Sequence, residues 1–175
     1  MRLLPDIRPR TRGRPMNSAK TYPVPETVAP QTVVIYCSSP RFQAAFRDFI
    51  ETTLGLKPGE YVPFVVAGGA GALTRPDMLP KEFRFLKERL ELFREQYASI
   101  KRVVIIGHED CQYYKKLSGK LGSLLPFHTH LPLADMKLLS QVFVRLLAHL
   151  GMRLELYYAK FADEKHTQIT IEPVI

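Results

Sequence analysis

Three side chains of this 175-residue chain could together bind a metal ion. His108 and Cys111 stand three residues apart, and Cys37 is the only other cysteine of the sequence. A His-x-x-Cys pair recurs by chance, but two thiolates and one imidazole are a familiar ligand set for a catalytic zinc ion whose fourth position is left for water. Sulfur and nitrogen ligands also favour zinc over magnesium or calcium. The alternative is that both cysteines are inert core thiols, which is a common fate of cysteines.

The predicted strands around these residues favour the metal hypothesis. Residues 32–36 and 102–106 are short apolar runs rich in β-branched side chains, which is typical of strands buried on both faces of a parallel sheet. Cys37 directly follows the first run, and His108 lies two residues after the second. Ligands bind beyond the carboxyl ends of parallel strands, so we expect both side chains at one binding edge.

Strands and helices alternate along the rest of the domain. Apolar spacing predicts helices at residues 41–54, 81–99, 111–117 and 134–150, and further strands at residues 62–67, 153–159 and 168–172, the last at a sheet edge. Such alternation predicts parallel βαβ units with right-handed crossovers. We therefore expect one α/β domain over residues 31–175.

The first 30 residues differ in composition from this domain. They contain six prolines, which disfavour regular structure, and residues 1–20 carry five of the eight net positive charges of the chain. We predict an extended basic arm that is solvated or packs on a neighbouring subunit. Nucleic-acid binding is the weaker alternative, because no aromatic side chains are interleaved with the arginines for base stacking.

The overall composition excludes several classes of protein. Hydrophobic residues make up 46% and charged residues 24% of the chain, an ordinary balance for a soluble globular protein. No apolar run approaches the roughly 20 residues that span a bilayer, and no apolar stretch at the start resembles a secretion signal. Two cysteines are too few for a disulfide scaffold. We expect a cytoplasmic protein without a membrane partner.

Three motifs, taken in order, resemble those of the β-class carbonic anhydrases. They are Cys37-Ser38-Ser39-Pro40-Arg41, then Val65-Val66 leading into Ala70-Gly71, then Ile106-Gly107-His108-Glu109-Asp110-Cys111. That family reads Cys-x-Asp-x-Arg, a valine-rich strand into Asn-Ala-Gly, and Gly-His-x-x-Cys. The resemblance covers residues 31–117 well and the C-terminal part only in outline.

The resemblance implies a zinc ion on Cys37, His108 and Cys111 in a three-layer α/β sandwich with a mainly parallel central sheet. It also implies a homodimer or higher homo-oligomer. The implied reaction is the reversible hydration of carbon dioxide to bicarbonate by zinc-bound hydroxide. Carbon dioxide, bicarbonate or a related small molecule would then be the substrate.

The chain departs from the family at Ser39, which stands where the family has the Asp of an Asp-Arg pair, while Arg41 is kept. A serine hydroxyl can accept a hydrogen bond but cannot form an ion pair with Arg41, so we expect zinc binding to survive this change better than the rate. Ser39 and Arg41 are the candidate catalytic residues of a slow zinc lyase. The alternative is a catalytically inactive zinc-binding homologue with a structural or regulatory role.

Other polar residues near the motifs admit two interpretations each. Arg41 is expected to serve the site, and a weak surface pair with Asp48 is the alternative. Asp110 or Glu109 could substitute for the missing carboxylate, although a solvated or helix N-terminal carboxylate is the stronger interpretation. His128 and His130 could form a second metal site or a proton shuttle, although a loop with exposed imidazoles is the stronger interpretation.

The glycine-rich turn and the tyrosines after Cys111 bear on the size of the site. Gly68, Gly69 and Ala72 stand where the family has larger polar residues, which could leave room for a larger ligand. Tyr113 and Tyr114 either line the mouth of the site or pack the short helix onto the sheet.

Overall fold

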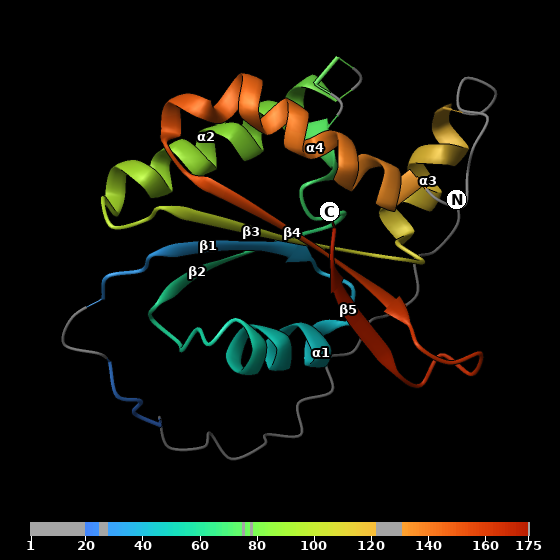
Figure 1. Cartoon of the computed structure of the whole chain (residues 1–175), viewed down its shortest axis with the longest axis horizontal. Helices are drawn as coiled ribbons and strands as arrows, with labels where there is room; N and C mark the ends of the chain where they lie inside the picture. The colour runs from blue at the N-terminus through green and yellow to red at the C-terminus, as the bar shows by residue number, and fades with distance from the viewer. Residues whose placement is uncertain (1–19, 25–27, 75, 78, 122–130, 175) are drawn as a thin grey trace, which may run out of the picture.

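A five-stranded sheet organises the chain in the computed structural model (Figure 1). The structure describes residues 20–24, 28–74, 76–77, 79–121 and 131–174. Most of the predicted arm, and both His128 and His130, lie outside the described residues, so the interpretations of these segments stay predictions.

The sheet has the strand order β2-β1-β3-β4-β5. The strands are β1 (Thr32–Cys37), β2 (Tyr61–Val66), β3 (Arg102–His108), β4 (Arg153–Phe161) and β5 (Ile169–Pro173). The first four run parallel, and β5 pairs antiparallel with β4 at the edge. The prediction of a mainly parallel sheet with a late edge strand is confirmed.

Helices cover both faces of the sheet and complete a three-layer sandwich. They are α1 (Gln43–Asp48), which continues as a π-helix over Phe49–Thr53, α2 (Pro80–Gln96), α3 (Gln112–Leu121) and α4 (Leu131–Leu147), with short 3-10 helices at Gly71–Thr74 and Ala148–Leu150. Figure 1 shows α1 on one face, α2 and α4 on the other, and α3 beyond the carboxyl end of β3. None of the described helices is long and apolar enough to span a membrane.

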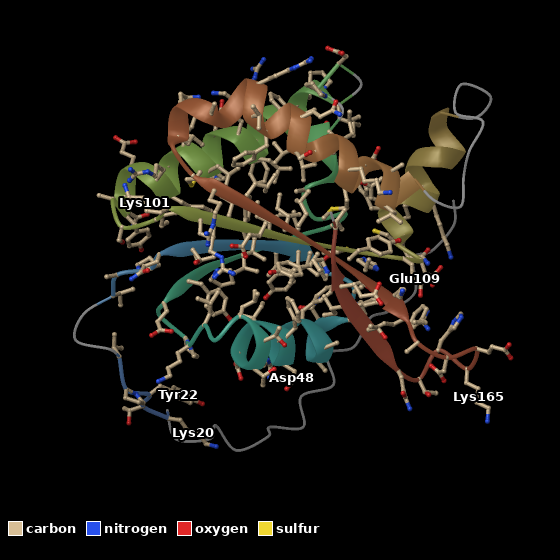
Figure 2. All side chains as sticks on the ribbon, in the orientation of Figure 1. Lys20, Tyr22, Asp48, Lys101, Glu109 and Lys165 are labelled. Carbon is tan, nitrogen blue, oxygen red and sulfur yellow. The ribbon has the colours of Figure 1, made fainter. Side chains whose placement is uncertain are left out.

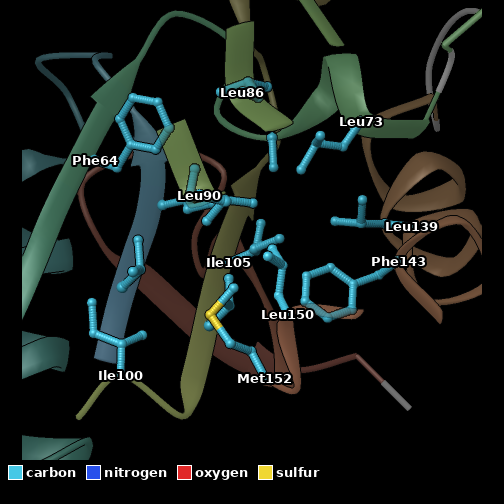
Figure 3. Close-up of a cluster of buried hydrophobic side chains, with 14 of the residues drawn as sticks. Phe64, Leu73, Leu86, Leu90, Ile100, Ile105, Leu139, Phe143, Leu150 and Met152 are labelled. Atoms are coloured by element: carbon cyan, nitrogen blue, oxygen red, sulfur yellow. The ribbon is translucent and has the colours of Figure 1, made fainter. Parts of the chain in front are cut away.

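Alternate residues of the central strands supply the two halves of the core. Ile35 and Ile105 pack with Leu90, Leu139 and other side chains of α2 and α4 (Figure 3). Val34, Val104 and Ile106 face the other way, toward the phenylalanines of α1. Because successive side chains of a strand point to opposite faces, an uninterrupted apolar run is needed where both faces are covered.

Most element boundaries differ by a few residues from those that the sequence predicts, and the differences at the first helix, β1 and β3 bear on the site. The helix expected over residues 41–54 is shorter and widens into π geometry, closed by a bond from the Leu54 N–H to the Phe49 carbonyl, and Gly55 follows with a φ of +64°. β1 and β3 run further than expected, because Cys37 pairs with Val66 and His108 with Ala159. The backbones of Cys37 and His108 are therefore held by the sheet.

Candidate metal centre

Cys37, His108 and Cys111 converge at the carboxyl edge of the sheet. Cys37 and His108 end the paired strands β1 and β3, and Cys111 directly precedes α3. One ligand atom from each residue lies within 4.8 Å of the others, and the two sulfur atoms are 3.8 Å apart. Tetrahedral coordination with Zn–S bonds of about 2.3 Å places two sulfurs about 3.8 Å apart. The spacing of the thiols therefore fits one zinc ion.

The imidazole of His108 is oriented as a metal ligand would be. Its Nδ1 lies 2.6 Å from the carbonyl oxygen of Glu109, which makes Nδ1–H the donor and leaves the lone pair on Nε2. Nε2 is buried and has no hydrogen-bond partner among the described residues. The ring packs against Phe42, with centroids 4.3 Å apart. A buried nitrogen of this kind requires a partner, and a metal ion beside the two sulfurs would supply it.

Backbone amides and one shared proton stabilise the two thiols. The Gly68 N–H donates to Cys37 Sγ over 3.3 Å, and the N–H groups of Tyr113 and Tyr114 donate to the sulfur of Cys111. The hydrogen bond from the Cys111 thiol, supported by the Gly68 amide, lowers the pKa of Cys37 to about 4. The same bond, together with burial, raises the pKa of Cys111. Without metal, the pair therefore contains one thiolate and one thiol at neutral pH.

A small cavity lies among the three ligand residues. Its volume is about 20 Å³, and Gly71, Tyr114 and Met136 also line it. Such a volume holds about one water-sized body. A larger cavity, about 800 Å³, lies at the amino-terminal edge of the sheet and is lined in part by Lys101. Figure 2 shows Lys101 and Glu109 at opposite ends of β3, so that large cavity is remote from the candidate ligands.

Neither a protein-family model nor a curated protein sequence matches this chain. Solved structures do match it. The carbonic anhydrase from Streptococcus mutans has a TM-score of 0.54 and 14% identity, over 89% of this chain and 88% of that one. The β-carbonic anhydrase isoform I from Trichomonas vaginalis has a TM-score of 0.52 and 16% identity, over the same shares of the two chains. The chain has the β-carbonic anhydrase fold.

Within this β-carbonic anhydrase fold, Arg41 does not pair with Asp48. Its Nη1 instead donates to Asp110 Oδ2 over 3.0 Å, and its guanidinium lies over the ring of Phe161, 4.5 Å from the centroid. Asp110 also pairs with Lys115, and these cations hold the pKa of its carboxyl below the usual value, with the Lys115 hydrogen bond as the largest cause. Asp110 is thus a partly exposed carboxylate near the start of α3 that also forms ion pairs, because the fold brings Arg41 to it.

Tyr113 and Tyr114 of α3 pack against the glycines of the glycine-rich turn, where larger side chains would not fit. A Cβ atom on Gly68 would lie 2.9 Å from Cε1 of Tyr113, and one on Gly71 would lie 2.9 Å from Cζ of Tyr114. The expectation that Gly68, Gly69 and Ala72 leave room for a larger ligand is therefore wrong at Gly68, where Tyr113 occupies the space. Tyr114 lines the ligand cavity, while Tyr113 borders a separate apolar cavity of about 300 Å³.

Asp135, near the centre, was not singled out in the sequence, whereas Glu109 was considered there as a substitute for the missing carboxylate. Asp135 of α4 is only 2% exposed and hydrogen bonds to Tyr114; burial, and then Asp135, raise the pKa of that tyrosine well above its usual value. Glu109 accepts a hydrogen bond from the Phe161 N–H, which ties the loop before α3 to the end of β4. The sequence signal that could have pointed to Asp135 was an acidic residue beside the apolar stripe of the helix predicted over residues 134–150.

Proposed function

We propose that this chain is a zinc-binding protein of the β-carbonic anhydrase type that slowly catalyses the reversible hydration of carbon dioxide. The observation that carries the proposal is the convergence of two sulfurs and the unpartnered Nε2 of His108 within 4.8 Å. Cys37, His108 and Cys111 would hold the ion. Zinc on such ligands supplies a water nucleophile that is ionised near neutral pH.

The protein's own groups prepare this centre in three ways. The Glu109 carbonyl fixes the tautomer of His108, and three backbone N–H groups stabilise the negative charge of the thiolates. The apolar cavity beside Tyr113, lined also by Val66 and Phe85, offers a binding space for an apolar substrate such as carbon dioxide. Carbon dioxide held there would reach the ligands only past Tyr113, whose ring covers Gly68.

Metal content is the first test of this proposal. We expect one zinc ion per chain by elemental analysis of the purified protein. Cys37→Ser and His108→Ala should each abolish stoichiometric zinc. His149→Ala is a matched control, since His149 is a histidine on the surface that contacts Glu91. A native chain without bound zinc would refute the metal assignment.

The rate of hydration tests the role of position 39. Ser39 lacks the charge that would orient a reacting water, so stopped-flow measurement with a pH indicator should find slow hydration. Ser39→Asp should raise the rate about 100-fold, the lower end of the range that a positioned acid or base contributes. Ser38→Asp is the control, because it adds the same charge at the exposed neighbouring position. A native rate equal to that of efficient zinc lyases would contradict our interpretation of Ser39.

A zinc-binding homologue without catalysis is the second candidate. Ser39 favours it, and so does the engagement of Arg41 by Asp110 rather than by a carboxylate at position 39. This candidate predicts stoichiometric zinc with no hydration above background in either the native chain or Ser39→Asp.

We also propose that the protein assembles as a homodimer or a higher homo-oligomer. Support comes from the resemblance and from two apolar side chains near the β2 edge of the sheet. Phe85, which lines the apolar cavity, is 45% exposed, and Val65 of β2 is 40% exposed. Light scattering coupled to size-exclusion chromatography measures the mass directly. A monomer at micromolar concentration would contradict the assembly without affecting the metal proposal.

A further inference from the structure

One ion pair joins the two loops that carry the thiol ligands. Arg41 lies four residues after Cys37 in the loop that follows β1, and Asp110 immediately precedes Cys111 in the loop that follows β3. The bond between Arg41 Nη1 and Asp110 Oδ2 is 3.0 Å long and connects residues 69 positions apart. It therefore links the two sulfur-bearing segments across the edge of the sheet.

Both members of this pair are held by further contacts. Asp110 has a left-handed backbone, with a φ of +56°, and its carboxylate also pairs with Lys115. The guanidinium of Arg41 rests on Phe161, whose ring lies 5.2 Å from that of Phe42. Phe42 in turn packs against the imidazole of His108. The contacts thus run from the ion pair to the third candidate ligand.

We propose that the Arg41–Asp110 pair is a clamp that holds Cys37 and Cys111 at the separation that a metal ion needs. In the resembling family, an Asp two residues before the arginine would hold it within its own loop. Ser39 leaves the arginine able to reach the second loop instead. Ligands that are already in place lose less conformational freedom when the metal binds, so the clamp raises metal affinity. This inference rests on the metal part of the proposed function and is independent of catalysis.

The two ends of the clamp separate its effect from that of charge alone. Loss of the Asp110 carboxylate removes a negative charge near a cation, so both explanations predict weaker zinc binding. Loss of the Arg41 guanidinium removes a positive charge. Charge alone then predicts tighter zinc binding, whereas the clamp predicts weaker binding, which makes Arg41 the decisive position.

The experiment measures zinc affinity of the full-length chain by competition with a chromophoric chelator at fixed pH and ionic strength. Arg41→Gln and Asp110→Asn should each weaken binding about tenfold, as is typical for groups that orient metal ligands. The double variant should bind no more weakly than either single variant, because both remove the same link. The exchanged pair, Arg41→Asp with Asp110→Arg, should recover most of the loss.

Two controls complete the design. Glu172→Gln removes the exposed Lys160–Glu172 pair, 2.8 Å long, on the β4–β5 hairpin and should leave the affinity unchanged. Arg41→Lys keeps the charge with a different geometry, so it should give an intermediate affinity, and circular dichroism verifies that each variant is folded. Zinc binding by Arg41→Gln that equals or exceeds that of the native chain would overturn the clamp. A native chain that binds no zinc would overturn the proposed function itself, which distinguishes the two failures.

Discussion

Zinc binding to Cys37 and Cys111 should release one thiol proton per ion, that of Cys111, between pH 7 and pH 9. The metal-free pair contains the Cys37 thiolate, whose pKa lies at about 4, and the Cys111 thiol, whose pKa is raised by the bond to that thiolate and by burial. His108 donates from Nδ1 to a carbonyl, which leaves the lone pair of Nε2 free for the metal. The ligands therefore give up only the proton of Cys111, and a zinc-bound water that ionises near neutral pH adds up to one more proton.

The size of the effect follows from this count. The Cys111 proton alone makes zinc affinity rise tenfold per pH unit, so it should make binding at pH 9 about 100-fold tighter than at pH 7, or about 2.7 kcal/mol. Ionisation of the zinc-bound water adds up to about 100-fold more over the same range. The affinity rises with pH because protons compete with zinc for Cys111. If both thiols were protonated in the metal-free chain, their protons would change the zinc affinity about 10,000-fold over this range. If both were thiolates, they would contribute no change.

Two measurements give the number of protons independently. Chelator competition at several pH values gives the slope of the zinc affinity, and calorimetry in two buffers of different ionisation enthalpy gives the protons released. Apparent slopes clearly above two or clearly below one would refute the assignment of one shared proton to the cysteine pair, because the zinc-bound water adds at most one proton. A slope between one and two by both methods would support it.

Three further predictions concern stability. Gly71→Ala should lower the free energy of unfolding by about 1–3 kcal/mol in urea titrations, because the new methyl group meets the buried Tyr114. An unchanged unfolding midpoint would mean that α3 can shift to make room. Ile105→Ala should lower the free energy of unfolding by about 2–5 kcal/mol in the same titration, since Ile105 is only 1% exposed where the sheet packs against two helices. A loss below about 1 kcal/mol would contradict that packing. Zinc at 100 times its dissociation constant should stabilise the native chain against unfolding by about 2.7 kcal/mol, and it should not stabilise the Cys37→Ser variant. Equal stabilisation of both proteins would mean that the ion binds at another site.

Most of the sheet could be predicted from local sequence. Residues 33–35 and 103–106 are buried on both faces of the sheet, where apolar, largely β-branched side chains are required. An uninterrupted apolar run of this kind therefore predicts a strand directly from the sequence. The ends of β1 and β3 could not be placed to the residue. They depend on how far the pairing of Cys37 with Val66 and of His108 with Ala159 continues, and this is a property of the neighbouring strands.

The types and order of the candidate ligands were likewise readable from the sequence. A cysteine after one buried run and a His-x-x-Cys after another predict a common edge once the strands are parallel. The replacement of the family's Asp by Ser39 was also visible from the sequence, and with it the expectation of a slow rate.

The partners of the polar groups were decided only by the tertiary structure. Arg41 and Asp110 are 69 positions apart, and no periodicity connects them; they meet because adjacent parallel strands bring their following loops together. The glycine-rich turn admits no larger ligand at Gly68 and Gly71, because tyrosines of α3 fold back onto it. Sequence specifies which atoms could bind a metal, whereas long-range packing determines how those atoms are held.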